Sequence, residues 1–197
     1  MLTQARAAIV STLFFTLLLG VGYPLVVTGI GQLAFPRQAE GSLIRNASGQ
    51  VIGSALLAQN FVKPEYLHPR PSAAGADGYD ASGSSGSNLG PLNEDLAKRV
   101  AASAKALRSE SPAQIPADAV TTSGSGLDPH ISPANALRQA SRVAAARGVP
   151  VSDVERMIAA NTDAPWLGVF GQPGVNVLKV NVALDAAAPI RKVLSAG

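Results

Sequence analysis

Four side chains in the middle of the chain have the types needed for nucleophilic catalysis: Ser123, Ser125, Asp128 and His130. In serine hydrolases, a histidine takes the hydroxyl proton, a carboxylate orients the histidine, and the three groups normally come from separate elements. Here Asp128-Pro-His130 forms a rigid local turn, and the sequence has no Gly-x-Ser-x-Gly elbow. We therefore predict that Asp128 caps a turn and that His130 makes a structural or interface hydrogen bond. A hydrolase using Ser125, Asp128 and His130 is the alternative.

A second candidate is the run from Ser84 to Gly90, which is rich in glycine and hydroxyl groups. A phosphate-binding P-loop also needs a Gly-Lys dipeptide whose lysine reaches the outer phosphates, and this chain contains none. We predict a tightly folded loop held by serine and asparagine side chains. The alternative is an auxiliary phosphate contact through backbone amides. The residues that would form it are Ser84, Gly86, Ser87, Asn88 and Gly90.

The run from Ser84 to Gly90 lies within a long segment without helical or strand periodicity, residues 68–91. Because a loop of this length is usually either functional or disordered, and because Tyr66, Arg70, Tyr79 and Asn88 punctuate it, we predict an ordered functional loop. Asn93 is expected to cap the helix that follows.

The remaining elements indicate a mixed α+β domain. Residues 42–44 and 51–52 flank a glycine-containing loop, which is typical of a hairpin. Ser132 as N-cap, Pro133 at the first helical position and Gly148 as the stop predict a helix. Ser152-Asp-Val-Glu155 predicts a capping box that opens a shorter helix. Alternating apolar residues over 175–184 predict the chain's best strand.

The N-terminal part of the chain differs from everything after it. Residues Ala7 to Phe35 carry no charge, and Arg6 and Arg37 flank them. A helix of about 20 apolar residues spans a bilayer core, so this run is long enough. A cleaved signal peptide should end at Gly20-Val-Gly22, yet the apolar run continues, which favours a retained anchor. We predict a short head over 1–6, a transmembrane helix over 7–35 and one soluble α+β domain over 36–197.

Small residues and a proline interrupt this run. Pro24 should kink or open the helix, and close helix contact is permitted by the glycines. We predict membrane packing against another helix through Gly20, Gly22, Pro24 and Gly29. Basic residues at the two ends do not fix the orientation. A short head before a long tail favours a soluble domain outside, in the periplasm.

Composition narrows the function classes. The net charge is +3 and there is no extended block of basic residues, which argues against nucleic-acid binding. The absence of cysteine excludes disulfides and thiol chemistry. The two histidines, His68 and His130, are too few for a usual protein zinc site, so we predict no metal.

Five separated motifs, taken in order, resemble one known family. They are Arg70-Pro-Ser-Ala73, Ser87-Asn-Leu-Gly-Pro91, Ser123-Gly-Ser-Gly-Leu-Asp-Pro-His-Ile-Ser-Pro133, Arg142-Val-Ala-x-Ala-Arg-Gly148 and Val175-Asn-Val-Leu-x-x-Asn-x-Ala-Leu-Asp185. Together with the N-terminal anchor, they resemble the C subunit (KdpC) family of the bacterial Kdp potassium-transporting ATPase. One departure is Ser84-Ser-Gly-Ser-Asn88, where the family usually has a second glycine. That change weakens any direct nucleotide contact through this loop.

The resemblance implies a noncatalytic accessory subunit of an ATP-driven potassium importer in the bacterial inner membrane. It implies two partners, a channel-like potassium-binding subunit and a P-type ATPase subunit, as well as membrane lipid. It also implies a catalytic chaperone that raises the ATP affinity of the hydrolysing subunit, so that ATP would be shared with that subunit rather than bound tightly here. Arg70, Gly124 and Gly126 join the serine, aspartate and histidine above as family-motif positions for partner contact or structure. A free-standing extracytoplasmic binding module is a further alternative.

Overall fold

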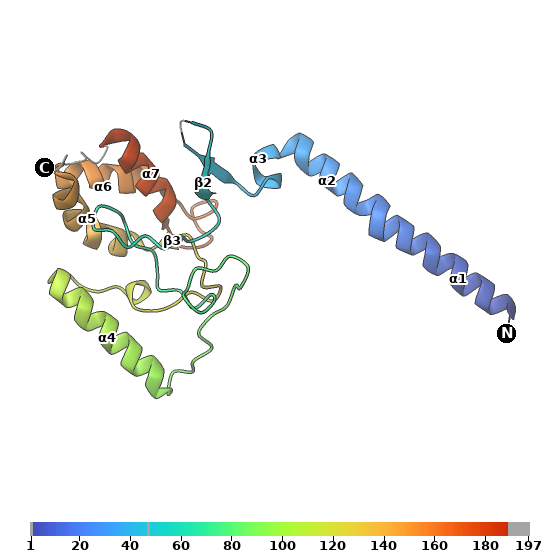
Figure 1. The fold of residues 1–197 in the computed structure, drawn as a ribbon, viewed down its shortest axis with the longest axis horizontal. Coiled ribbons are helices and arrows are strands. Elements are labelled where there is room, and N and C mark those ends of the chain that lie inside the picture. Colours follow the sequence, from blue (N-terminus) through green and yellow to red (C-terminus); the bar gives the residue numbers. More distant parts are fainter. Residues whose placement is uncertain (1, 47, 189–197) are drawn as a thin grey trace, which may run out of the picture. The chain divides into compact units, whose positions relative to one another are not determined.

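The computed structural model describes residues 2–46 and 48–188. Its contacts divide the chain into two compact units, one ending at Ser54 and the other beginning at Ala55. The first unit contains the N-terminal helix and a hairpin, and the second contains the remaining helices and a small sheet (Figure 1). The predicted α+β fold with one apolar N-terminal helix is confirmed.

The N-terminal helix is continuous from its start to Ala34. Its three parts are α1 (Leu2–Leu17), the π-helical segment η1 (Leu18–Gly22) and α2 (Tyr23–Ala34). Pro24 has no N–H to donate to the Gly20 carbonyl, and the turn before it is widened, with Tyr23 N–H donating to the Leu18 carbonyl. The predicted local opening at Pro24 is therefore a π-type turn. Gln4–Ala34 is long and apolar enough to cross a membrane, with a mean hydropathy of 2.0.

A short helix and a hairpin follow in the first unit. Helix α3 (Pro36–Ala39) leads into strands β1 (Leu43–Arg45) and β2 (Val51–Ser54), which pair antiparallel. The Asn46 side chain accepts hydrogen bonds from the backbone N–H groups of Ser48 and Gln50, which closes the turn between the strands. The predicted hairpin is confirmed.

The core of the second unit is formed by three helices and a three-stranded antiparallel sheet. The helices are α5 (Pro133–Arg147), α6 (Val151–Ala160) and α7 (Val177–Ala187). The strands are β3 (His130–Ile131), β4 (Thr162–Asp163) and β5 (Gly174–Asn176), in the order β3-β5-β4. Buried side chains from these elements form one apolar cluster: Ile131, Ala136, Ala140, Val143, Ala144, Val154, Ile158, Val175, Val177, Val180 and Leu184.

The helix limits at α5 follow the predicted signals. The Ser132 side chain accepts a hydrogen bond from Asn135 N–H, Pro133 is the first helical residue, and Gly148 ends the helix in the left-handed conformation. Helix α4 (Glu94–Glu110) is likewise capped by Asn93, whose side chain accepts from the next turn. The three-residue 3₁₀ helix η2 (Ala117–Ala119) lies between α4 and β3.

The strand predicted over 175–184 is wrong. Only Gly174–Asn176 is a strand, and the chain then turns into α7, with the Asn176 side chain accepting from Lys179 N–H as the N-cap. Alternation suggested that Leu178, Val180, Val182 and Leu184 share a face. The buried set is instead Val177, Leu178, Val180, Asn181 and Leu184, which has helical spacing. Tertiary burial outweighs the strand preference of the valines here.

The predicted capping box at Ser152 is also wrong in detail. A helix is present, but α6 begins at Val151 and its N-cap is Pro150, so Ser152 lies inside the first turn. No side-chain cap hydrogen bond is present at the start of α6. The Ser152 side chain therefore does not act as the cap.

The long segment before α4 is held against the helices by polar side chains. Asn181 bonds both the N–H and the carbonyl of Leu67, and Gln139 does the same for His68. The Arg142 guanidinium donates to the carbonyls of Pro64 and Tyr66. Because buried backbone polar groups need partners, these side chains fix the path of the loop. Of the loop predicted over 68–91, these contacts hold only its first residue, His68.

Candidate functional site

An ion pair joins the long loop to the segment before β3. The Arg70 Nη1 atom lies 3.2 Å from Asp128 Oδ2, and Arg70 Nη2 donates to the Thr122 carbonyl at 3.2 Å. Both side chains are partly buried, with exposed fractions of 23% and 32%. A guanidinium that bonds a carboxylate and a carbonyl at once fixes direction as well as distance. The predicted motif positions Arg70 and Asp128 are therefore brought together, although 58 residues separate them.

Asp128 also organises the turn into β3. Its Oδ1 atom accepts a hydrogen bond from His130 N–H at 3.0 Å, which is the turn cap that the sequence predicts. The His130 Nε2 atom lies 3.0 Å from Asp163 Oδ2 on β4. Lys179 on α7 lies 3.6 Å from the other oxygen of Asp163. His130 thus makes a hydrogen bond within the fold, to a partner that sequence reasoning missed, and an interface role for His130 stays a prediction.

The charges in this cluster support one another. The Asp128 carboxylate, followed by Asp163, raises the pKa of His130 above its ordinary value of 6.5 despite partial burial. In return, the His130 ring and backbone N–H, with the Arg70 guanidinium, lower the pKa of Asp128 below 3.8. The Nδ1 atom of His130 is 3.8 Å from Asp128 Oδ1, whereas the Nε2 atom is only 3.0 Å from Asp163 Oδ2. Both carboxylates therefore stabilise the imidazolium.

Glycines allow two loops to pack backbone to backbone. Gly126 has a φ of +68°, and a Cβ there would lie 2.6 Å from the Ser85 carbonyl oxygen. A Cβ on Gly86 would lie 3.0 Å from the Gly124 carbonyl oxygen. No side chain fits at the first position without movement of the backbone. These glycines in the candidate motifs serve close approach between the two motifs.

Hydroxyl groups fasten the same two loops. Ser84 Oγ donates to the Ser125 carbonyl at 3.1 Å, and Ser85 N–H donates to the same oxygen at 2.9 Å. Ser72 Oγ donates to the Gly126 carbonyl at 2.6 Å. Ser125 Oγ in turn lies 3.4 Å from Ser123 Oγ and accepts from Leu127 N–H. Much of the serine content of both motifs is thus used within the fold.

An open cleft of about 610 Å³ lies over this arrangement. It is lined by apolar side chains, by serine hydroxyls and by the Arg70–Asp128 ion pair, whose opposite charges offset each other. The lining residues are Leu56, Leu57, Arg70, Ala81, Ser84, Ser123, Gly124, Ser125, Leu127, Asp128 and Pro129. Such a surface can hydrogen-bond a polar partner. In residues 2–46 and 48–188, no three His, Asp or Glu side chains converge so as to hold a metal ion.

The structure does not gather all the predicted positions. Ser84 and Gly86 contact the Ser123–Gly126 loop, whereas Asn88 is exposed with a φ of +52°. Gly90 is also exposed, and its carbonyl accepts from Asn93 N–H at the start of α4. The nucleotide or interface role of Ser84, Gly86, Ser87, Asn88 and Gly90 stays a prediction.

Several residues that build the site were missed by sequence reasoning. Ser72 accepts from the N–H groups of Ala74 and Tyr79, and Asp163 and Gln139 bond groups distant in sequence. Of these, only Ser72 lies inside a recognised motif, in Arg70-Pro-Ser-Ala73. The other contacts join positions with no local sequence pattern, so periodicity and turn signals could not reveal them. The Tyr79 hydroxyl donates to the Arg70 carbonyl, so this tyrosine helps to fix the loop in which it was singled out.

The fold and site define the class of protein: a helix suited to a membrane span, joined to a small α+β domain whose loops are fastened by Arg, Ser, Asp and His side chains. The family model described as "KdpC: K+-transporting ATPase, c chain" matches residues 5–186. The chain belongs to the KdpC family.

Relatives match over almost their whole length. A potassium-transporting ATPase KdpC subunit of Caulobacter vibrioides (strain NA1000 / CB15N) is 65% identical over 190 residues, covering 96% of both chains. The protein of the same name from Caulobacter sp. (strain K31) is 63% identical over 190 residues, with the same coverage. The one from Beijerinckia indica subsp. indica is 62% identical over 195 residues and covers 98% of both chains. Family membership, together with the apolar N-terminal helix, fits a single-pass inner-membrane protein.

Proposed function

We propose that this protein is a noncatalytic accessory subunit of an ATP-driven potassium import complex, needed for its assembly and activity. Family membership across residues 5–186 supports the complex. The proposal that the subunit is noncatalytic is supported by the hydrogen bonds that side chains of the run from Ser123 to Pro133 make within the fold. The Ser125 hydroxyl contacts Ser123 and Leu127 within this run, whereas Asp128 pairs with Arg70 of the long loop and His130 pairs with Asp163 on β4.

A hydrolase is disfavoured by the same contacts. A serine nucleophile needs a histidine nitrogen within hydrogen-bond reach of its hydroxyl. Ser125 Oγ is engaged by Ser123 and Leu127, while His130 Nε2 faces Asp163. We expect the purified chain to leave generic esters uncleaved. Turnover that disappears in His130→Ala would establish the hydrolase instead.

The central experiment compares the complex with and without this chain. We expect the chain to co-purify stoichiometrically with a channel-like potassium-binding subunit and a P-type ATPase subunit. We expect potassium-stimulated ATP hydrolysis to be lost when the chain is omitted during expression. Full activity without the chain would refute the accessory role. Purification without a stoichiometric membrane partner would favour a free-standing binding module.

The N-terminal helix is proposed to be a retained anchor that packs against a partner helix. Among the described residues, and apart from adjacent residues and the nearby backbone of the helix itself, no atom lies within 4 Å of a Cβ built at Gly20 or Gly29; at Gly22 the nearest atom is the Leu17 carbonyl oxygen, 3.8 Å away. The glycine surface is thus open to an external helix. We expect Gly22→Leu and Gly29→Leu to weaken co-purification while the domain from Ala55 onward stays folded. Val27→Leu, at an exposed position on a different face of the helix from Gly22 and Gly29, is the control.

The soluble domain is proposed to lie in the periplasm. There it cannot touch cytosolic ATP, so a rise in the ATP affinity of the hydrolysing subunit would come from biasing that subunit's conformation. Protease added to right-side-out vesicles tests this placement. Cleavage of the domain from outside is expected. Protection of a domain that is cleaved in detergent would overturn the placement and reopen direct nucleotide contact through Ser84–Gly90.

A further inference from the structure

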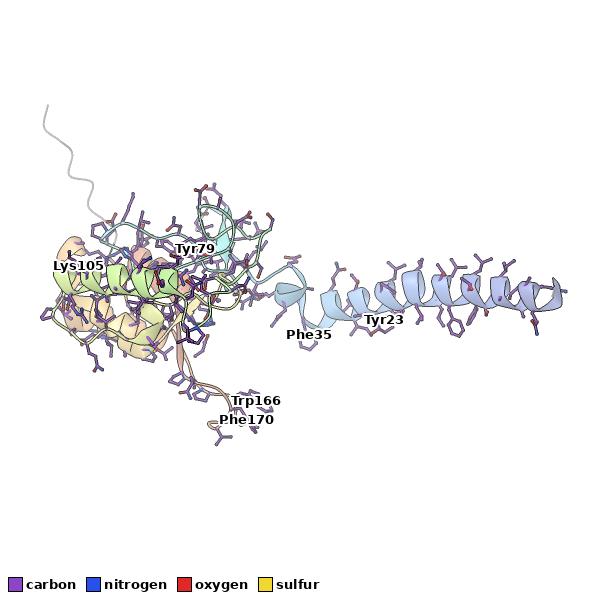
Figure 2. The ribbon with its side chains drawn as sticks, turned by 90° about the horizontal axis from the view of Figure 1, so that it is seen from below. Tyr23, Phe35, Tyr79, Lys105, Trp166 and Phe170 are labelled. Atoms are coloured by element: carbon purple, nitrogen blue, oxygen red, sulfur yellow. The ribbon has the colours of Figure 1, made fainter. Side chains whose placement is uncertain are left out.

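The turn between β4 and β5 exposes an unusual concentration of apolar side chains. Within residues 165–171, here called the aromatic turn, Trp166, Leu167, Val169 and Phe170 are 70%, 72%, 74% and 61% exposed. Figure 2 shows Trp166 and Phe170 side by side at the end of a segment that extends away from the helices of its domain. From these fractions, the exposed apolar area is on the order of 500 Å², near the upper range for patches on a monomer. Patches of this size usually mark a binding surface.

The aromatic turn has a defined shape. Trp166 N–H donates to the Phe170 carbonyl at 2.8 Å, and Phe170 N–H donates back at 3.0 Å. The two rings contact each other with centroids 5.7 Å apart. Leu167 has a φ of +52°, which a residue with a side chain adopts only when its surroundings enforce it. A preformed, convex turn loses little entropy on entering a complementary pocket.

Charge distinguishes a protein pocket from a lipid surface. Residues 164–174 contain no charged side chain. At the base of the turn, Asp163 is paired with His130 and with Lys179. Loops that attach to anionic membranes carry basic residues that meet the headgroups, and the aromatic turn has none. Tryptophan is also enriched among residues that dominate binding energy at protein interfaces.

We infer that the aromatic turn inserts into an apolar, uncharged pocket on another protein subunit of the transport complex. This inference depends on the proposed function, because it requires that such a complex exists. The turn's area is below the roughly 800 Å² per partner of a stable independent interface. It therefore acts as an anchor point within a larger contact, strengthened because the N-terminal helix holds both partners in one membrane.

Cross-linking in the purified complex tests the contact directly. A photo-reactive benzophenone side chain replaces Leu167, and in a control it replaces Leu92, which is 98% exposed in the segment before α4. The group at position 167 is expected to form an adduct with one protein subunit, in higher yield than at position 92. Adducts with lipid alone, or none, would overturn the inference.

The bilayer alternative has its own readout, because Trp166 is the only tryptophan in the chain. The full chain alone is placed in nanodiscs with either ordinary or brominated acyl chains, and its fluorescence is compared. We expect equal intensity, since without its partner the turn stays in water. Strong quenching by brominated lipid would assign the aromatic turn to the membrane and refute the protein pocket.

A double variant separates this inference from the proposed function. Trp166→Ser with Phe170→Ser should reduce the affinity of the chain for the complex on the order of tenfold, as removal of central aromatic anchors does. Leu92→Ser is the control, and circular dichroism checks that the helices remain. If the double variant assembles normally while omission of the whole chain abolishes the pump, only the inference fails. If the unaltered chain never joins a complex, the proposed function fails.

Discussion

Two regions of the domain that begins at Ala55 are held together by different forces. The helices α5, α6 and α7 meet through buried aliphatic side chains, including Val143, Val154 and Leu184. The loops at 55–91 and 120–130 meet through arginine and serine side chains that bond distant backbone groups, and through the Arg70–Asp128 ion pair. Apolar burial depends on volume and is tolerant of direction, whereas a hydrogen bond depends on the position of single atoms. Loss of buried side-chain volume should therefore destabilise the helices most. A change in backbone or hydrogen-bond geometry should destabilise the loops most.

The largest effect is expected in the helical region. Leu184→Ala removes a fully buried side chain from α7 and should lower the free energy of unfolding by about 2–5 kcal/mol. Val182→Ala is the control, since Val182 is only half-buried on the same helix. Thermal unfolding of the full chain in detergent, followed by circular dichroism, measures both. Equal losses would indicate that 182 and 184 share a buried face, as in the strand that the alternation suggested.

The next effect belongs to the loops. Gly126→Ala forces a side chain onto a residue with a φ of +68° and against the Ser85 carbonyl, so we expect a loss of about 1–3 kcal/mol. Gly90→Ala serves as the matched control, because its Cβ would meet nothing within 4 Å and its φ is not positive. The same unfolding measurement applies. A neutral Gly126→Ala would show that the two loops are not closely packed.

What the sequence reveals differs between these regions for a physical reason. Helix limits depend on neighbouring residues, so Asn93, Ser132 and Gly148 were readable as caps and stops. Loop positions depend on partners far along the chain. The bond from Asn181 to Leu67 spans 114 residues and has no local signature. Turn chemistry at Asp128 was predictable, but its pairing with Arg70 and the pairing of His130 with Asp163 were not.

The wrong strand at 175–184 shows how two periods can compete. The same valines and leucines satisfy a period of two and, in part, a helical period. The deciding signal was Asn176, three residues before the Lys179 N–H that it caps, followed by apolar positions 177, 180 and 184. A polar Asn181 within this face would have been unsatisfied in an apolar core unless a loop reached it. The loop that reaches Asn181 is the one containing Leu67, whose backbone carbonyl accepts a hydrogen bond from the Asn181 side chain.

A smaller effect should appear in how stability depends on pH. The contributions of His130 and His68 to stability should change with pH in opposite directions. The pKa of His130 is raised, chiefly by Asp128 and then Asp163, so its contribution is present below about pH 6.5 and is lost as pH rises through the raised pKa. Burial lowers the pKa of His68, so its contribution is lost as pH falls through the lowered pKa. His130→Asn should therefore destabilise more at about pH 6 than at about pH 8.5.

The magnitude of this pH effect should stay below about 1 kcal/mol, because His130 and Asp163 are both more than a third exposed and solvent screens them. Unfolding midpoints of the wild type, His130→Asn and His68→Asn across this pH range provide the test. The His68 variant should show the reverse trend. A pH response unchanged by His130→Asn would remove the imidazolium from the Asp128–Asp163 cluster.

The smallest effect is expected at Ser152, and it separates two serines that look alike in the sequence. Ser132 caps α5 and also donates to Asp118, so Ser132→Ala should cost about 1 kcal/mol or slightly more. Ser152 lies inside the first turn of α6, after the Pro150 cap, so Ser152→Ala should change stability by less than about 0.5 kcal/mol. Alanine's higher helix propensity favours a slight gain. The two variants are compared by urea unfolding of the full chain in detergent. Equal losses would restore Ser152 as the cap and move the start of α6 forward, whereas the expected inequality shows that of the two serines only Ser132 acts as a side-chain cap.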